Sequence, residues 1–115
     1  MAIYTFNAKE LYNSLITRED IAVLDVRNSK DFSRSQVESP YPFIMENISY
    51  FDFMEIENAC IKKVREFAGE RPIKVICAKE GSAKYVSEIL ASHGLPDVSY
   101  LEGGIKSWGN LLVPV

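Results

Sequence analysis

The chain has 115 residues, of which 47% are hydrophobic and 25% are charged, as in ordinary soluble globular proteins. A chain of this length folds around one hydrophobic core, so we expect residues 1–115 to form a single domain with one site. Thirteen basic and sixteen acidic residues give a net charge of −3, without a basic run that would bind phosphates or anionic lipids. Nucleic acid and membrane surfaces are therefore poor candidate partners.

The beginning of the chain does not have the basic and then apolar segments of a secretory signal. Its longest aliphatic stretches, such as Ile21–Leu24, are far shorter than the roughly 20 residues that a membrane-spanning helix needs. The two cysteines, Cys60 and Cys77, are too few for a disulfide framework. The sequence therefore predicts a cytoplasmic protein without a transmembrane segment.

The first predicted elements are a helix and a buried strand. Asn7 followed by Glu10 has the spacing of a capping box, and an apolar stripe behind it predicts a helix over residues 8–17. Ile21–Val26 is a nearly continuous, β-rich apolar run, which is typical of a strand buried on both faces of a parallel sheet.

The middle of the chain is less regular. Ser39–Pro42 predicts a loop, and we expect another strand within Phe43–Phe53, although the pattern there is too irregular to place it. The next helix is indicated by apolar residues with helical spacing, namely Cys60, Ile61, Val64, Phe67 and Ala68.

The last third contains two more apolar runs, Ile73–Cys77 and Val98–Leu101, with a helix between them that Ser82 is expected to cap. Strands thus alternate with helices, which predicts an α/β fold: an open parallel β-sheet with helices on both faces. In such sheets the ligand site lies beyond the carboxyl ends of the strands. The candidate functional residues are therefore those that follow Val26, Cys77 and Leu101.

Cys77 ends a buried strand and is followed closely by a helix. A helix start presents unpaired N–H groups and a partial positive charge, which together stabilise an anion such as a thiolate. Cys77 is therefore a candidate nucleophile. The spacing alone leaves equally open that Cys77 is a small core residue at a strand end.

The sequence does not provide the usual partners of a catalytic cysteine. Its one histidine, His93, lies at the far end of the helix that follows Cys77, roughly 16 Å from the helix start. Two cysteines and a distant histidine make a poor zinc site, and Cys-x-x-Cys and nucleotide-binding glycine motifs are absent. We therefore expect no metal and no cofactor. Cys60 is expected in the core, with a role as a resolving thiol as the alternative.

Three segments together resemble the single-domain rhodaneses, a family of sulfurtransferases. They are Leu24–Arg27, then Val75–Ala83 with Cys77, and then Tyr100–Trp108 with its Glu-Gly-Gly turn. The resemblance implies a parallel sheet of about five strands and a nucleophile at Cys77. It also implies that backbone N–H groups bind the substrate, from Ala78, Lys79, Glu80, Gly81, Ser82 and Ala83.

The resemblance implies that the Cys77 thiolate takes a sulfane sulfur from a donor and passes it, as a persulfide, to a thiophilic acceptor. The donor would be a small sulfur-containing anion such as thiosulfate, or a protein persulfide, and the acceptor a thiol. Because thiolate and persulfide are both anions, fixed N–H donors suffice without a general base. The alternative function is a non-catalytic rhodanese-like interaction or sensing module.

Other motif residues are expected to support the site. By resemblance, Asp25 and Arg27 form an ion pair that braces it. Gly103-Gly104 would form a tight turn beside the loop that begins at Cys77 (the Cys77 loop), and Trp108 would anchor the last helix. Ser82 is open to a second role as a hydroxyl donor, and Lys79 is either a donor-attracting cation or a solvated surface residue.

The sequence departs from the family at two places. Ser35–Pro40 replaces a turn that usually reads like His-Ile-Pro-Gly-Ala, and Glu80 stands where glycine is common. A carboxylate at that position would repel a dianionic donor. The sequence also disfavours a cysteine phosphatase. Such an enzyme needs an arginine six residues after its cysteine, and Ala83 occupies that position.

Overall fold

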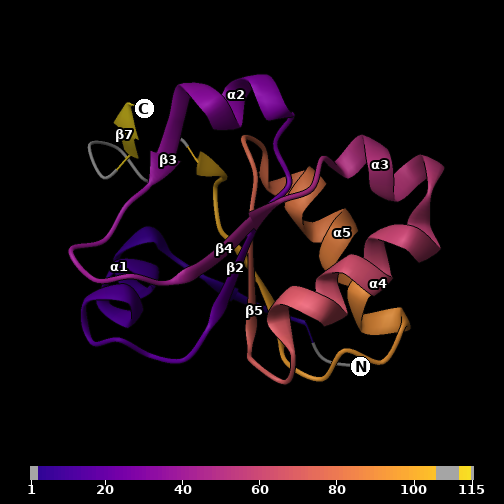
Figure 1. Ribbon diagram of the computed structural model, residues 1–115, viewed down its shortest axis with the longest axis horizontal. Coiled ribbons are helices and arrows are strands. Elements are labelled where there is room, and N and C mark those ends of the chain that lie inside the picture. Colours follow the sequence, from indigo (N-terminus) through magenta and orange to yellow (C-terminus); the bar gives the residue numbers. More distant parts are fainter. Residues whose placement is uncertain (1–2, 106–111, 115) are drawn as a thin grey trace.

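Five strands form a parallel sheet at the centre of the computed structural model, which describes residues 3–105 and 112–114 (Figure 1). In chain order they are β1 (Tyr4–Phe6), β2 (Ala22–Asp25), β4 (Ile44–Asn47), β5 (Ile73–Ile76) and β6 (Val98–Leu101). Across the sheet the order is β1-β6-β5-β2-β4, and every neighbouring pair is parallel. The predicted open parallel sheet is confirmed, and the carboxyl ends of its strands lie together.

Helices cover both faces of this sheet. One face carries α1 (Ala8–Ile16), and the other carries α3 (Tyr50–Glu55), α4 (Glu57–Ala68) and α5 (Glu80–Ser92) (Figure 1). A short helix, α2 (Ser29–Arg34), lies beyond the carboxyl ends of the central strands. After it, β3 (Ser35–Val37) pairs antiparallel with β7 (Leu112–Pro114) in a separate two-stranded sheet. Among the described residues, none of the helices is long and apolar enough to cross a membrane.

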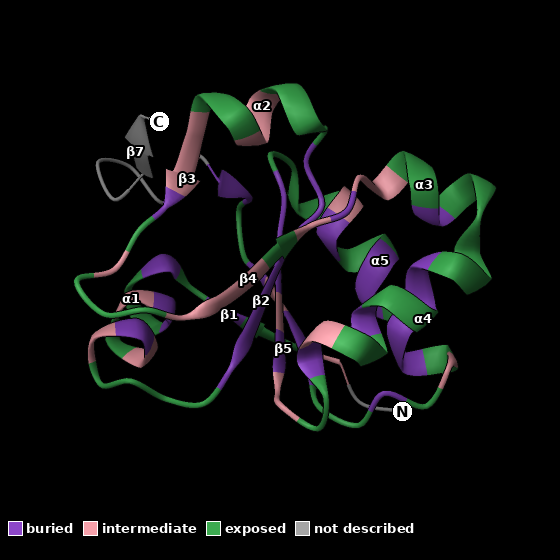
Figure 2. Ribbon diagram, in the orientation of Figure 1, coloured by how far each residue is buried: buried purple, intermediate pink, exposed green. Residues whose placement is uncertain are grey.

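The sheet separates two apolar clusters, one under each layer of helices (Figure 2). Alternate residues of the central strands point to opposite faces. Val23 and Ile76 therefore pack toward α1, whereas Leu24 and Val75 pack toward α4 and α5. All four residues of β2 are fully buried, which confirms the prediction of a strand covered on both faces.

The capping box predicted for α1 is present. The Asn7 side chain accepts a hydrogen bond from the Glu10 N–H at 2.8 Å, and the Glu10 carboxylate accepts one from the Asn7 N–H at 3.0 Å. Two N–H groups without acceptors inside the helix are thus paired at its first turn. The helix ends at residue 16, one residue before the predicted end.

The segment Phe43–Phe53, expected to hold a strand, contains β4 in its first half and the beginning of α3 in its second. Because β4 is an edge strand and only partly buried, it does not have the continuous apolar run of β2 and β5. Three-residue strands and six-residue helices are too short to show a period, so the sequence did not predict β3, α2 or α3. Trp108, expected to anchor a last helix, lies outside the described residues.

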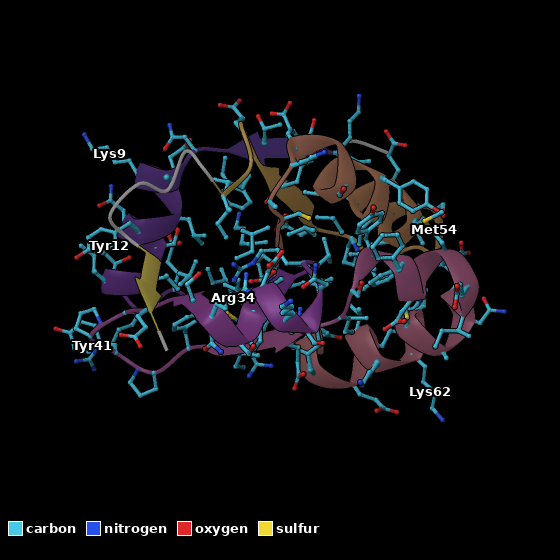
Figure 3. The ribbon with its side chains drawn as sticks, turned by 90° about the horizontal axis from the view of Figure 1, so that it is seen from above. Lys9, Tyr12, Arg34, Tyr41, Met54 and Lys62 are labelled. Atoms are coloured by element: carbon cyan, nitrogen blue, oxygen red, sulfur yellow. The ribbon has the colours of Figure 1, made fainter. Side chains whose placement is uncertain are left out.

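Phe53 provides a test of the core between α3 and the sheet. Its side chain is fully buried, whereas the next residue, Met54, is 60% exposed and points outward from the same helix (Figure 3). We expect Phe53→Ala to lower the free energy of unfolding by about 3–5 kcal/mol, because a large cavity forms. Urea denaturation should show a change within about 0.5 kcal/mol for the control Met54→Ala. Equal effects of the two substitutions would contradict this packing.

Candidate active site

Cys77 lies directly after β5 and lines a cavity of about 190 Å³ at the carboxyl end of the sheet. Only 3% of the residue is exposed. The cavity is formed by segments that follow three neighbouring strands, and its lining residues are Arg27, Asn28, Asp31, Tyr50, Phe51, Cys77, Ala78, Lys79 and Ser82. The structure thus brings Cys77 together with Ala78, Lys79, Ser82 and Arg27, whereas the other predicted residues, Glu80, Gly81 and Ala83, are not among the lining residues.

The helix that follows Cys77 begins earlier than predicted. Its first residue is Glu80, and Lys79 occupies the N-cap position with extended backbone and without a side-chain cap hydrogen bond. The prediction that Ser82 caps this helix is wrong, because Ser82 is already its third residue, half-buried at the cavity wall. The start of α5 therefore lies three residues after the sulfur-bearing Cys77.

The first turn of α5 determines which backbone donors serve the site. The Ala83 N–H donates to the Lys79 carbonyl at 3.4 Å and so belongs to the hydrogen bonds of the helix. The N–H groups of Glu80, Gly81 and Ser82 precede it and have no acceptor within a regular helix. The donors that a bound anion would meet at this end are those of the first three helical residues.

The predicted ion pair between Asp25 and Arg27 is confirmed. Arg27 Nη2 lies 2.8 Å from Asp25 Oδ2, and Nε lies 3.0 and 3.1 Å from the two carboxylate oxygens. Both side chains are buried, with 4% and 0% exposed. Arg27 Nη2 also donates to the Ser35 carbonyl at 2.6 Å. The carboxylate and the carbonyl hold the guanidinium beside the Cys77 cavity.

Asn47 supports the site from outside the cavity lining, and the sequence did not reveal this role. It ends β4 opposite Asp25, and its Nδ2 group donates to the carbonyls of Asp25 at 2.9 Å and of Arg27 at 2.8 Å. These bonds fix the backbone that carries the ion pair. The role of this single amide side chain can be recognised only when the register of β4 against β2 is known.

An aromatic wall is the second feature that the sequence did not predict. Tyr50 and Phe51 begin α3 and line the cavity, with ring centroids 4.2 Å apart. Phe51 is 52% exposed, so one side of the entrance to Cys77 is apolar. The cavity also has polar lining residues, of which Asn28 caps α2 by accepting a hydrogen bond from the Asp31 N–H at 2.8 Å.

The turn after β6 packs against the Cys77 loop, as predicted. Gly103 and Gly104 both have positive φ, at 74° and 68°. A Cβ atom at Gly104 would lie 2.5 Å from the Ala78 carbonyl oxygen, so only glycine fits there. The next residue, Ile105, donates its N–H to the Cys77 carbonyl at 2.8 Å.

His93 and Cys60 lie apart from the cavity. His93 is at the opposite end of α5, where its Nε2 lies 2.7 Å from Glu57 Oε2. Cys60 is buried in the core on α4, as predicted. Burial raises the pKa of the Cys60 thiol, Asp52 raises it further, and Lys63 opposes the effect. Within the described ranges, we find no cluster of three histidine, cysteine or acidic side chains that would hold a metal ion.

Comparison with known proteins identifies this arrangement. A family model described as the rhodanese-like domain matches residues 7–111. The chain belongs to the rhodanese-like domain family. This family is one of sulfurtransferases in general, and its fold agrees with the parallel sheet described above. No match was found among curated proteins.

Solved structures of rhodanese-like proteins have the same fold. A rhodanese-related protein from Thermoplasma volcanium has 26% identity and a TM-score of 0.67, over 96% of this chain and 97% of that chain. The Alr3790 protein from Anabaena sp. has 18% identity and a TM-score of 0.76, over 96% and 82%. An NAD-dependent persulfide reductase from A. fulgidus has 24% identity and a TM-score of 0.62, where 92% of this chain covers 16% of that chain.

Substitution of Gly104 tests the close packing of the turn on the Cys77 loop. We expect Gly104→Ala to destabilise the rhodanese-like fold by more than Gly94→Ala, a matched control with a φ of 84° and open space around it. The control reports backbone strain alone, about 1–2 kcal/mol. Gly104→Ala must also displace the Ala78 backbone, which adds about 1–3 kcal/mol. Chemical denaturation would refute the close contact if both variants lost the same stability.

The raised pKa of Cys60 predicts a pH dependence of stability. The folded protein holds the thiol proton more tightly than the unfolded chain, in which the ordinary value is 9.0. This contribution to stability is therefore complete below that value and is lost as the pH rises through the folded pKa. We expect the stability of wild type relative to Cys60→Ala, measured by denaturation, to fall as the pH rises above 9.0. A difference independent of pH would contradict the shift.

Proposed function

We propose that the protein is a sulfurtransferase in which Cys77 carries a sulfane sulfur as a persulfide. The observation that carries this proposal is the position of Cys77, which lines a cavity at the end of β5 and lies three residues before the first turn of α5. Membership of the rhodanese-like family supports it. The proposal includes one domain over residues 1–115 and a reducing, cytoplasmic setting in which both cysteines stay as thiols.

The proposed reaction has two displacements at sulfur. In the first, the Cys77 thiolate attacks the outer sulfur of thiosulfate, the sulfur–sulfur bond of thiosulfate breaks, and sulfite leaves with the electron pair. In the second, an acceptor thiolate attacks the terminal sulfur of the persulfide, and the Cys77 thiolate leaves. Neither step needs an external oxidant or reductant, and a protein persulfide replaces thiosulfate as donor by the same chemistry.

The residues around Cys77 support both states of the sulfur. The N–H groups at the start of α5 and the positive end of its dipole favour an anion, whether thiolate or persulfide. Ser82 lines the cavity with a hydroxyl group that is available as a further donor. The ion pair with Asp25 holds Arg27 in place in the cavity lining. No group in this scheme has to transfer a proton.

The charged and apolar side chains that line the cavity indicate which type of sulfur donor it favours. Lys79 attracts an anion, whereas the charge of Arg27 is already balanced by Asp25, and Asp31 adds an opposing charge. The cavity therefore has little excess positive charge for a dianion such as thiosulfate. An apolar entrance at Phe51 favours a persulfide on an organic or protein carrier as the physiological donor. The name of the A. fulgidus neighbour also refers to persulfide chemistry.

A comparison of the two cysteines tests the proposal. We expect Cys77→Ser to abolish sulfur loading, because the nucleophile is lost, and Cys60→Ser to retain it within about three-fold, since Cys60 is buried elsewhere in the core. Purified protein is incubated with thiosulfate or a polysulfide, and intact mass shows whether one sulfur atom is added. Loading that survives in Cys77→Ser would refute the proposal. Failure of wild type to load would favour a non-catalytic interaction or sensing module.

A further inference from the structure

The carboxylate of Glu80 is bound to the turn that follows β6. Glu80 is the first residue of α5, and its Oε1 accepts a hydrogen bond from the Gly103 N–H at 3.0 Å, although the two residues are 23 positions apart. A carboxylate near the site was expected to repel an anionic donor. The structure instead directs one of its oxygens to a backbone N–H.

A second hydrogen bond also joins this turn to the Cys77 loop. The Ile105 N–H binds the Cys77 carbonyl at 2.8 Å, at the beginning of the loop, and Glu80 binds Gly103 at its end. Between them, Gly104 packs directly on the Ala78 backbone. The four residues 77–80 are therefore fastened to the turn at both ends.

We propose that Glu80 is a positioning residue, whose carboxylate oxygen holds the Gly103–Gly104 turn against the Cys77 loop and so keeps the sulfur and the α5 donors in their reactive arrangement. The inference rests on the proposed function of Cys77 and adds to it how the loop is held. The hydrogen bond uses a charged acceptor, which makes it stronger than a bond between neutral groups. Glu80 also lies at the positive end of α5, where its charge stabilises the helix.

Two substitutions separate positioning from charge repulsion. Glu80→Gln keeps an acceptor oxygen at the same position and removes the charge, whereas Glu80→Ala removes both. If Glu80 positions the loop, Glu80→Ala lowers the second-order rate of sulfur loading from thiosulfate about ten-fold, and Glu80→Gln restores it to within about two-fold of wild type. If the carboxylate acts by repelling the donor, both variants load thiosulfate faster than wild type, and the proposal is overturned.

Glu88→Ala is the matched control, because Glu88 is an exposed glutamate on the same helix and lies outside the cavity lining. We expect it to load sulfur at the wild-type rate. A loss of the same size in Glu80→Ala and Glu88→Ala would show that only the helix is affected, and would overturn the positioning role.

Two further measurements do not depend on sulfur transfer. Loss of the hydrogen bond in Glu80→Ala should speed amide hydrogen exchange at Gly103. It should also change the rate at which iodoacetamide alkylates Cys77 by about ten-fold. In Glu80→Gln, both rates should stay near those of wild type. These results still decide the role of Glu80 if wild type fails to load sulfur, in which case the proposed function alone is wrong. Unchanged exchange and alkylation in Glu80→Ala would refute the inference.

Discussion

The buried ion pair between Asp25 and Arg27 joins four elements at the carboxyl end of the sheet. Arg27 binds the Asp25 carboxylate at the end of β2, the Ser35 carbonyl at the start of β3 and, more weakly, the Asp31 carbonyl on α2. Asn47, at the end of β4, holds the backbone of the pair itself. Removing one partner would leave a charge in the protein interior, which costs about 3–5 kcal/mol. The shape of the candidate site therefore depends on this pair remaining complete.

The sequence predicted the parts of the fold that rest on long-range burial. Ile21–Val26 and Ile73–Cys77 are apolar on both faces because they are central strands. Each apolar run can be recognised within its own segment, without knowing which strands lie beside it. The capping box at Asn7 is local and was equally readable. In contrast, β4 is a half-exposed edge strand, and α2 spans six residues with none fully buried, so neither shows a periodic apolar pattern. Their positions depend on tertiary contacts that a single sequence does not display.

The parts of the candidate site that could be predicted are those whose role follows from their place in the sequence relative to a strand or helix. Cys77 was recognisable because it directly follows a buried strand and precedes a helix. Asn47 was not, because its role depends on the pairing of β4 with β2. Ser82 has a side chain that commonly caps helices, yet the helix begins two residues before it. Glu80 was interpreted by its charge alone, whereas its hydrogen bond to Gly103 depends on a turn far away in the sequence. The sequence shows the type of each residue, but it does not show which partner the side chain binds in the folded protein.

The pairing of β1 with β6 has a consequence for how the protein is made. β1 is an edge strand that joins the sheet through β6, so β1 is synthesised long before the strand that it pairs with. Until β6 arrives, one edge of β5 also has unpaired backbone groups, which are a template for aggregation. The turn that fastens the Cys77 loop follows β6 directly. On the ribosome, the Cys77 loop is therefore synthesised before the turn that holds it, and a chain truncated before β6 would expose an unsupported thiol beside an open sheet edge.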